Sequence, residues 1–230
     1  MVAVFSPRNE LVQDFLPALS FQSMYGSLSP HGDGYGVAFF REETLHVRKE
    51  VEAVWNHRTL FSDNDRGNIL IMHSRKATMG DRKIDHVHPF SSHFDGKDYV
   101  FCHNGRIGDF EDHPEWIDSR QYFEWMMKYI PMDPDFPSAI RLAIKELLQH
   151  VTDFSSLNAF FSDGHTLAAI RVCPPDDYYH SLFWKQDPEG RTVITTERWE
   201  YFPHVPWSSL SHQHMLLVDA SGARSVKLNG

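Results

Sequence analysis

The stretch YVFCHNGRIGDF at residues 99–110 starts as a run of aromatic and apolar residues and then turns abruptly polar. Its first part, Tyr99–Cys102, predicts a buried strand, because short apolar runs bounded by turn residues are typical of sheets. The segment HNG follows directly. Asn104 offers a side-chain amide N–H and Gly105 an unshielded backbone N–H, and such donors form oxyanion holes. An Asn-Gly pair is also an ordinary hairpin signal, so the segment by itself equally favours a tight turn.

Apolar runs on both sides of this stretch predict further strands, with helices concentrated in the middle of the chain. The other predicted strands are Val2–Phe5, Tyr35–Arg41, Leu45–Lys49, Ile69–His73, Leu157–Phe161, Thr166–Val172, His180–Trp184, Thr192–Thr195 and His214–Val218. The predicted helices are Leu11–Met24, a weak one over Ala53–Leu60, one capped by Asp118 or Ser119, and one capped by Ser138. The spacing of Ile140, Ala143, Ile144 and Leu147 puts them on one apolar face of the last helix. Strands, then helices, then strands predict a layered α/β (α+β) fold, in which two mostly antiparallel sheets carry helices on their outer faces.

Length and composition narrow the class of protein. The 230 residues are 41% hydrophobic and 13% aromatic, which argues for a real core and against disorder. With no linker, repeat or low-complexity stretch, we expect residues 1–230 to form a single domain. The net charge of -9, without any basic run, argues against a nucleic-acid partner. Cys102 and Cys173 lack the spacing of a disulfide framework or zinc site. No signal peptide or apolar span is evident, so we expect a cytoplasmic protein without membrane contact.

Three further polar segments carry candidate ligand-binding residues. The loop HSRKATMG, residues 73–80, supplies Arg75, which can pair with a carboxylate in bidentate geometry, and the Thr78 hydroxyl. Asp118 can cap a helix or bind an ammonium group. HGDGYG, residues 31–36, opens a strand, so it is not a dinucleotide fingerprint, which would open a helix. An Arg, an Asp and the Asn104–Gly105 donors together predict a pocket for an amino-acid amide such as glutamine.

In their order, these segments resemble the class II glutamine amidotransferase domain, which has the N-terminal-nucleophile (Ntn) hydrolase fold. The resemblance rests on HGDGYG (31–36), MHSRKATMG (72–80), HVHPF (86–90), HNG (103–105), IDSRQYFEW (117–125) and LNAFFSDGHTLAA (157–169). It implies a four-layer αββα sandwich without a cofactor or metal. It further implies that Arg75, Thr78, His88 and Asp118 hold glutamine, glutamate or a γ-glutamyl amide, and that Asn104 and Gly105 stabilise the oxyanion.

The resemblance breaks at the N-terminus. The family's nucleophile is a cysteine directly after the initiator Met, whose own α-amine acts as the base, whereas this sequence has Val2 there. An isopropyl group cannot attack an amide, so we expect a pseudoenzyme that binds but does not cleave. Val2→Cys is then expected to create glutaminase activity. An active amidohydrolase, whose true start supplies the cysteine, is the alternative, and removal of Met1 would still leave an α-amine on Val2.

Two other classes of function stay open at this point. His86 and His88 share one face if HVH is extended, and with His73 or His103 they could hold a zinc ion whose hydroxide replaces the thiol. A purely structural or interaction role is the other, suggested by Val2 and by the aromatic residues between Tyr178 and Trp207. The oligomeric state is not determined by the sequence.

Overall fold

The computed structural model describes residues 1–28, 30–56, 61–78, 80–110, 113, 115–174, 177–199 and 205–228. The helices are α1 (Leu16–Tyr25), α2 (Asp118–Tyr129) and α3 (Phe136–His150), with 3-10 turns at Val12–Asp14, Val54–Asn56, Ile84–His86 and Ile130–Met132. The strands are β1 (Val2–Leu11), β2 (Tyr35–Arg41), β3 (Thr44–Glu50), β4 (Arg66–Ser74), β5 (Phe90–Phe94), β6 (Lys97–Asn104), β7 (Asn158–Ser162), β8 (Leu167–Arg171), β9 (Phe183–Gln186), β10 (Thr192–Thr195), β11 (Ser208–Ser209), β12 (His214–Asp219) and β13 (Gly222–Lys227).

The strands form two antiparallel sheets. Sheet A has the order β11-β9-β10-β1-β4-β2-β3, and sheet B has the order β13-β12-β8-β7-β6-β5. Strands far apart in the chain meet in sheet A, where β1 lies between β10 and β4. The predicted two-sheet antiparallel design is confirmed. None of the helices in the described ranges has the length and apolar character needed to cross a bilayer.

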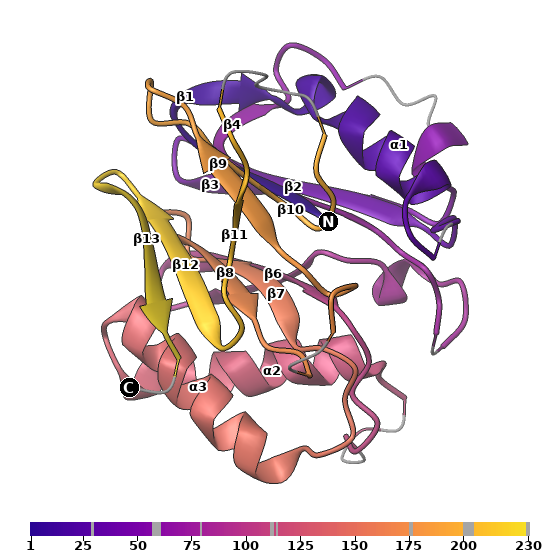
Figure 1. Cartoon of the computed structure of the whole chain (residues 1–230), viewed down its shortest axis with the longest axis vertical. Helices are drawn as coiled ribbons and strands as arrows, with labels where there is room; N and C mark the ends of the chain where they lie inside the picture. Colours follow the sequence, from indigo (N-terminus) through magenta and orange to yellow (C-terminus); the bar gives the residue numbers. More distant parts are fainter. Residues whose placement is uncertain are drawn as a thin grey trace.

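Helices cover the outer face of each sheet, which gives four layers (Figure 1). The alternation of β1 decides which side chains face which layer, because successive residues of a strand point to opposite faces. Val2 and Val4 pack toward α1 with Phe15 and Leu19. Met1, Ala3 and Phe5 face the other way, into the apolar layer between the two sheets.

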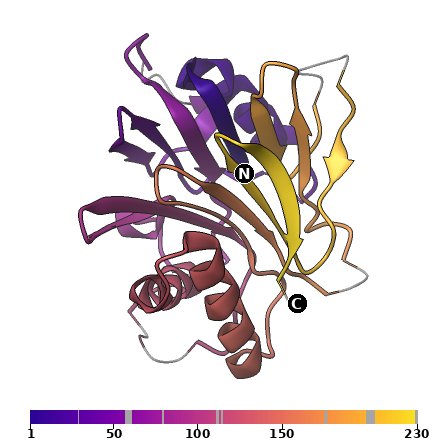
Figure 2. The ribbon, with the colours of Figure 1, turned by 90° about the vertical axis from the view of Figure 1, so that its left-hand side faces the viewer.

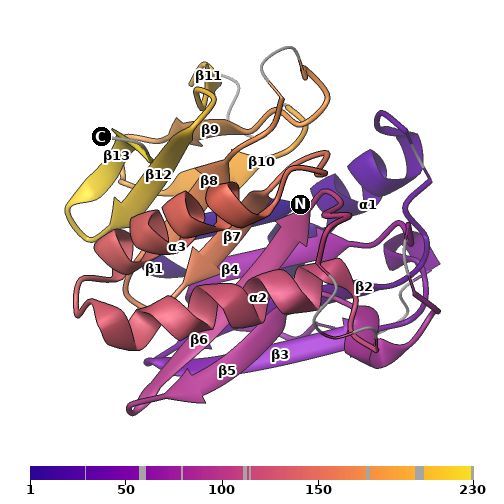
Figure 3. The same cartoon turned by 90° about the horizontal axis from the view of Figure 1, so that it is seen from below.

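The outer face of sheet B is covered by α2 and α3, which lie side by side across it (Figure 3). The predicted apolar face of α3, which includes Ile140, Ala143, Ile144 and Leu147, is fully buried there. Phe101 of β6 contacts the rings of Tyr122 and Phe123 on α2. Figure 2 shows both helices on one side of sheet B and the β12–β13 hairpin along the edge of the stack. The contacts of Phe101 with α2 therefore fix the position of β6, the strand that leads into HNG.

Several predicted boundaries are wrong. The helix expected from Leu11 begins at Leu16, because Leu11 still pairs with Arg66 in sheet A. Only a 3-10 turn forms within the predicted helix at 53–60, of which residues 57–60 lie outside the described part. The strand expected from His180 begins at Phe183, because the His180 backbone N–H donates to the Asp177 carboxylate in a turn (3.0 Å). The edge strands β5 and β13 were not predicted, since edge strands carry many polar residues.

Both expected helix caps are also wrong. Asp118 is the first residue of α2, after Ile117, and no side chain caps that helix. The cap of α3 is Asp135, whose carboxylate accepts a hydrogen bond from the Ser138 backbone N–H (3.0 Å). A capping side chain accepts a hydrogen bond from the backbone N–H two or three residues after it. Ser138 instead donates its own N–H to the cap and lies inside the helix. The Asp118 carboxylate is consequently available to accept a hydrogen bond from the Ile107 N–H.

Candidate functional site

A cavity of about 360 Å³ lies where the ends of β4 and β6 meet the start of α2. We call it the first cavity. Every site residue expected from the sequence except Val2 lines it: Arg75, Thr78, His88, Asn104, Gly105 and Asp118. These residues come from segments far apart in the chain, so the fold brings the predicted constellation together. Sequence reasoning missed Tyr179, His180 and Ser155, which also line the cavity.

Arg75 is held at the rim of sheet A by its own backbone. Its N–H donates to the Gly34 carbonyl (2.8 Å), and its carbonyl accepts from the Asp33 N–H (2.9 Å). The residue is 4% exposed, and its Nη1 donates to the Asp81 carbonyl (3.2 Å). Burial lowers the pKa of Arg75, while the nearby carboxylates of Asp33 and Asp118 act to raise it. The cavity therefore contains a fixed guanidinium between two acidic groups.

The glycine of HNG is required by close packing. A Cβ on Gly105 would lie 2.1 Å from the Ser156 carbonyl oxygen, closer than any side chain tolerates. After Gly105 the chain runs beside residues 154–156, with the Ser155 N–H donating to the Arg106 carbonyl (2.9 Å). The hairpin-turn interpretation of Asn104–Gly105 is therefore wrong. Instead, Asn104 ends β6 at the cavity wall.

Asp118 connects α2 to the loop that follows HNG. Its Oδ2 accepts a hydrogen bond from the Ile107 N–H (2.8 Å), and its Oδ1 accepts one from the Ser119 N–H (2.8 Å). The residue is 4% exposed. Each carboxylate oxygen has a second lone-pair direction, so the group can still accept a bond from a ligand ammonium. The same side chain thus positions the Asn104–Gly105 corner and supplies negative charge beside it.

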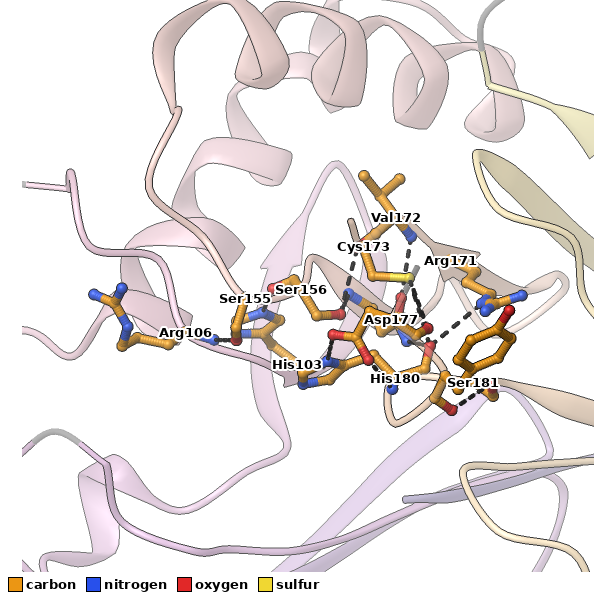
Figure 4. Close-up of polar contacts among 12 residues, drawn as sticks. His103, Arg106, Ser155, Ser156, Arg171, Val172, Cys173, Asp177, His180 and Ser181 are labelled. Carbon is orange, nitrogen blue, oxygen red and sulfur yellow. Dashed lines mark hydrogen bonds and ion pairs between the residues drawn. The ribbon is translucent and has the colours of Figure 1, made fainter. Parts of the chain in front are cut away.

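A network of polar contacts fixes the part of the cavity wall that contains His103, Ser155 and His180 (Figure 4). His103 Nε2 lies 2.8 Å from the Ser156 carbonyl oxygen, which can only accept, so this nitrogen carries the proton. His103 Nδ1 then accepts from the Ser119 hydroxyl (2.8 Å). The ring of His180 is oriented by Asp177, with 2.5 Å between Nδ1 and Oδ2. No pattern in the sequence indicates this Asp–His pair, because the turn that forms it is not periodic.

The three-histidine zinc site that the sequence left open does not form in the described part of the chain. His86 lies in the 3-10 turn Ile84–His86, with Nδ1 3.0 Å from the Asp81 carbonyl oxygen, so HVH is not an extended segment with two rings on one face. Both ring nitrogens of His103 are already hydrogen-bonded. Within the described ranges, no three His, Cys, Asp or Glu side chains are grouped to hold a metal ion.

His73 and His88 are buried as a pair at the back of the first cavity. Their ring centroids are 4.2 Å apart, and burial lowers the pKa of both well below the usual 6.5. In the described structure, neither ring nitrogen of His88 has a hydrogen-bond partner. His88 therefore contributes a neutral, buried ring to the cavity wall.

Replacing His88 by Leu is expected to stabilise the protein, most of all in acid. The change removes an unpaired buried N–H, which costs about 1–3 kcal/mol. A lowered pKa means that the unfolded chain binds the proton first, so stability falls as pH drops below 6.5, by about 1.4 kcal/mol per pH unit for each such histidine. Urea unfolding at pH 7.5 and pH 5 measures both effects. His86→Leu is the control, and an equally steep acid loss in both variants contradicts the assignment.

A second cavity of about 310 Å³ adjoins the first. The two cavities share His31, His73, Ser74, Asn104 and Tyr179 in their walls. Met1 lines this second cavity, and its α-amine donates to the Thr196 hydroxyl (3.0 Å). Burial lowers the pKa of this amine from 8.0 to about 6, although the negative charge of Glu197 opposes the shift.

Val2 lines neither cavity. Its side chain is fully buried against the α1 side of sheet A, while that of Met1 faces the layer between the sheets. Strand alternation thus places residue 1, and not residue 2, in the wall of the second cavity. Sequence reasoning missed this because the sequence does not show which face of β1 turns toward the second sheet.

Several known proteins resemble this chain in sequence or in fold. A protein of Haemophilus influenzae, provisionally named a glutamine amidotransferase, is 28% identical over 168 residues, which are 65% of this chain and 55% of the relative. The chain thus spans about half the length of that relative. The Bacillus subtilis glutamine phosphoribosylpyrophosphate amidotransferase superposes with a TM-score of 0.72 at 12% identity, over 99% of this chain and 49% of the other. A predicted glutamine amidotransferase from Pseudomonas aeruginosa gives 0.63 at 17% identity, over 96% and 98%.

The structural likenesses confirm the Ntn-hydrolase sandwich expected from the sequence. The family profile "Glutamine amidotransferases class-II" matches residues 9–190, which include the described segments that form the first cavity. Because this match covers most of the sequence, the chain belongs to the class II glutamine amidotransferase family.

Proposed function

We propose that the first cavity binds glutamine or a γ-glutamyl amide, and that residues 1–230 act as one amidotransferase-like unit with impaired thiol-dependent glutaminase chemistry. The observation that carries this proposal is the convergence of Arg75, Asn104, Gly105 and Asp118 on one cavity. A guanidinium can bind the α-carboxylate of glutamine, a carboxylate can bind its ammonium group, and two N–H donors can bind its amide oxygen. Membership of the family supports the same ligand class.

Each group of the ligand has a distinct partner in this arrangement. Arg75 pairs with the α-carboxylate in bidentate fashion, with the Thr78 hydroxyl as a further donor. Asp118 accepts from the α-ammonium. The Asn104 side-chain amide and the Gly105 N–H donate to the amide oxygen, and both strengthen if negative charge develops there. Arg75 and Asp118 thus fix the amino-acid end, while Asn104 and Gly105 fix the end that reacts in the family.

The proposal of impaired cleavage rests on the side chains available at the reacting end. The thioether of Met1 is a poor nucleophile, and Val2 faces away from both cavities. The Cys102 thiol lies 3.5 Å from the Met1 sulfur, but burial raises its pKa to about 12, so it stays protonated. Cys173 lines neither cavity, and burial also raises its pKa. An active amidohydrolase remains the competing function, and ammonia release at neutral pH by protein of verified N-terminal mass would support it.

Binding of truncated glutamines tests the ligand assignment without changing the protein. We expect L-glutamine to bind, and glutaramic acid or 4-aminobutanamide, which lack the ammonium or the carboxylate, to bind about tenfold or more weakly, because each leaves a buried charge unpaired. Isothermal titration measures the three dissociation constants. Equal affinity for all three compounds, or no binding of glutamine at millimolar concentration, contradicts the proposed site.

A further inference from the structure

The second cavity is unexplained by glutamine binding, because a bare amide nitrogen needs little room. We propose that it is a subsite for the amine part of a γ-glutamyl amide, and that the amine carries an aromatic ring. This inference rests on the proposed function of the first cavity. It narrows the proposed ligands from γ-glutamyl amides in general to γ-glutamyl arylamides and arylalkylamides.

The positions of the two cavities set the direction of the ligand. Arg75 and Asp118 line only the first cavity, whereas Asn104 lines both. With the α-carbon groups at Arg75 and Asp118 and the amide oxygen at Asn104, the remaining substituent of the amide is the one on nitrogen. The second cavity begins at that wall, so a group on the amide nitrogen can extend into it without disturbing the glutamyl contacts.

The side chains around the second cavity favour an aromatic group. Tyr178, Tyr179 and Phe183 contribute three rings to its lining. Tyr178 is 86% exposed and Tyr179 is 36% exposed, so core packing does not account for the position of either ring. Aromatic pairs contribute binding free energy beyond that of the area that they bury. Arg198 lies over the Phe183 ring (5.0 Å to the centroid), which fixes one face of that ring.

Polar groups at the shared wall suit the amide N–H of such a ligand. His73 is 6% exposed and lines both cavities, yet its Nδ1 has no hydrogen-bond partner in the described structure. His31 Nε2, at the same wall, is likewise unpartnered among described residues. The Glu197 carboxylate, held by the Ser27 N–H (2.7 Å), gives the far side negative charge. An N-substituted amide there has the Glu197 carboxylate on one side and the rings of His73 and His31 on the other.

Titration with three γ-glutamyl compounds tests the subsite. We expect L-γ-glutamyl-p-nitroanilide to bind about tenfold more tightly than L-glutamine, with the γ-glutamyl ethylamide in between, because only the anilide reaches the rings. Phe183→Ala is expected to remove most of the anilide's advantage while leaving the glutamine dissociation constant within about twofold. The matched control is Phe94→Ala, which changes a half-exposed ring on β5, outside both cavities.

The outcomes separate this inference from the proposed function. If glutamine binds and the anilide binds no better, the subsite is wrong and the glutamine site stands. If neither compound binds, the proposed function fails and the subsite falls with it. If the anilide binds more tightly but Phe183→Ala and Phe94→Ala affect it equally, the aromatic group does not occupy the second cavity, and the subsite is again wrong.

Discussion

Cysteine at residue 1 is expected to raise ammonia release from glutamine by about a thousandfold, whereas cysteine at residue 2 leaves it unchanged. The Met1 side chain faces the layer between the sheets beside the second cavity, and its α-amine, with a pKa of about 6, is a free base at neutral pH. Asn104 lines the same cavity, so we expect a thiol at residue 1 to reach the amide carbon of a glutamine held there. The same thiol at residue 2 lies in the apolar cluster under α1, away from both cavities.

The two variants control for each other. Met1→Cys is made by adding a start codon before the new cysteine, and intact mass verifies that the added Met is removed. Val2→Cys, which the sequence alone recommends as the activating change, is made in the same way. Coupled glutamate and ammonia assays at pH 7.5 measure the rates, and thermal unfolding verifies that both variants fold. Activity from Val2→Cys without activity from Met1→Cys contradicts the strand alternation at this end of β1.

Arg75→Lys is expected to weaken glutamine binding by about 10- to 100-fold, which corresponds to the loss of one charge-assisted hydrogen bond. Lysine keeps the positive charge between Asp33 and Asp118, so electrostatic balance in the cavity is preserved. It cannot present the planar pair of donors that a carboxylate accepts. The expected loss of glutamine affinity therefore reports the geometry of the donors and not their charge. Isothermal titration measures it.

Arg106→Lys is the matched control for this change. Arg106 also lines the first cavity, but its guanidinium pairs with Asp153 at the surface (2.5 Å). Because this guanidinium is exposed and already paired with Asp153, glutamine affinity in Arg106→Lys should stay within about threefold of the unchanged protein. If both variants lose affinity equally, Arg75 is not the carboxylate partner. If neither loses affinity, the α-carboxylate lies elsewhere.

Local patterns in the sequence determined the type of most elements and the identity of the pocket residues. Apolar runs such as Ile69–His73 and Tyr99–Cys102 became strands β4 and β6, because burial on both faces requires an unbroken apolar run. The spacing in α3 predicted its buried face. Arg75, Asn104 and Gly105 were recognisable because they stand where an apolar strand ends. Thr78 belongs to the loop after Arg75, and Asp118 begins a helix.

Tertiary structure alone decided how those residues meet and what else joins them. Whether Asp118 caps a helix depends on the distance to Ile107, which no local pattern encodes. The Asp177–His180 pair and the second cavity arise from turns whose positions follow from packing. Above all, the alternation of β1 shows only that residues 1 and 2 face opposite ways. Which of them reaches the cavity is decided by the side on which sheet B stacks, and that is a property of the assembled core.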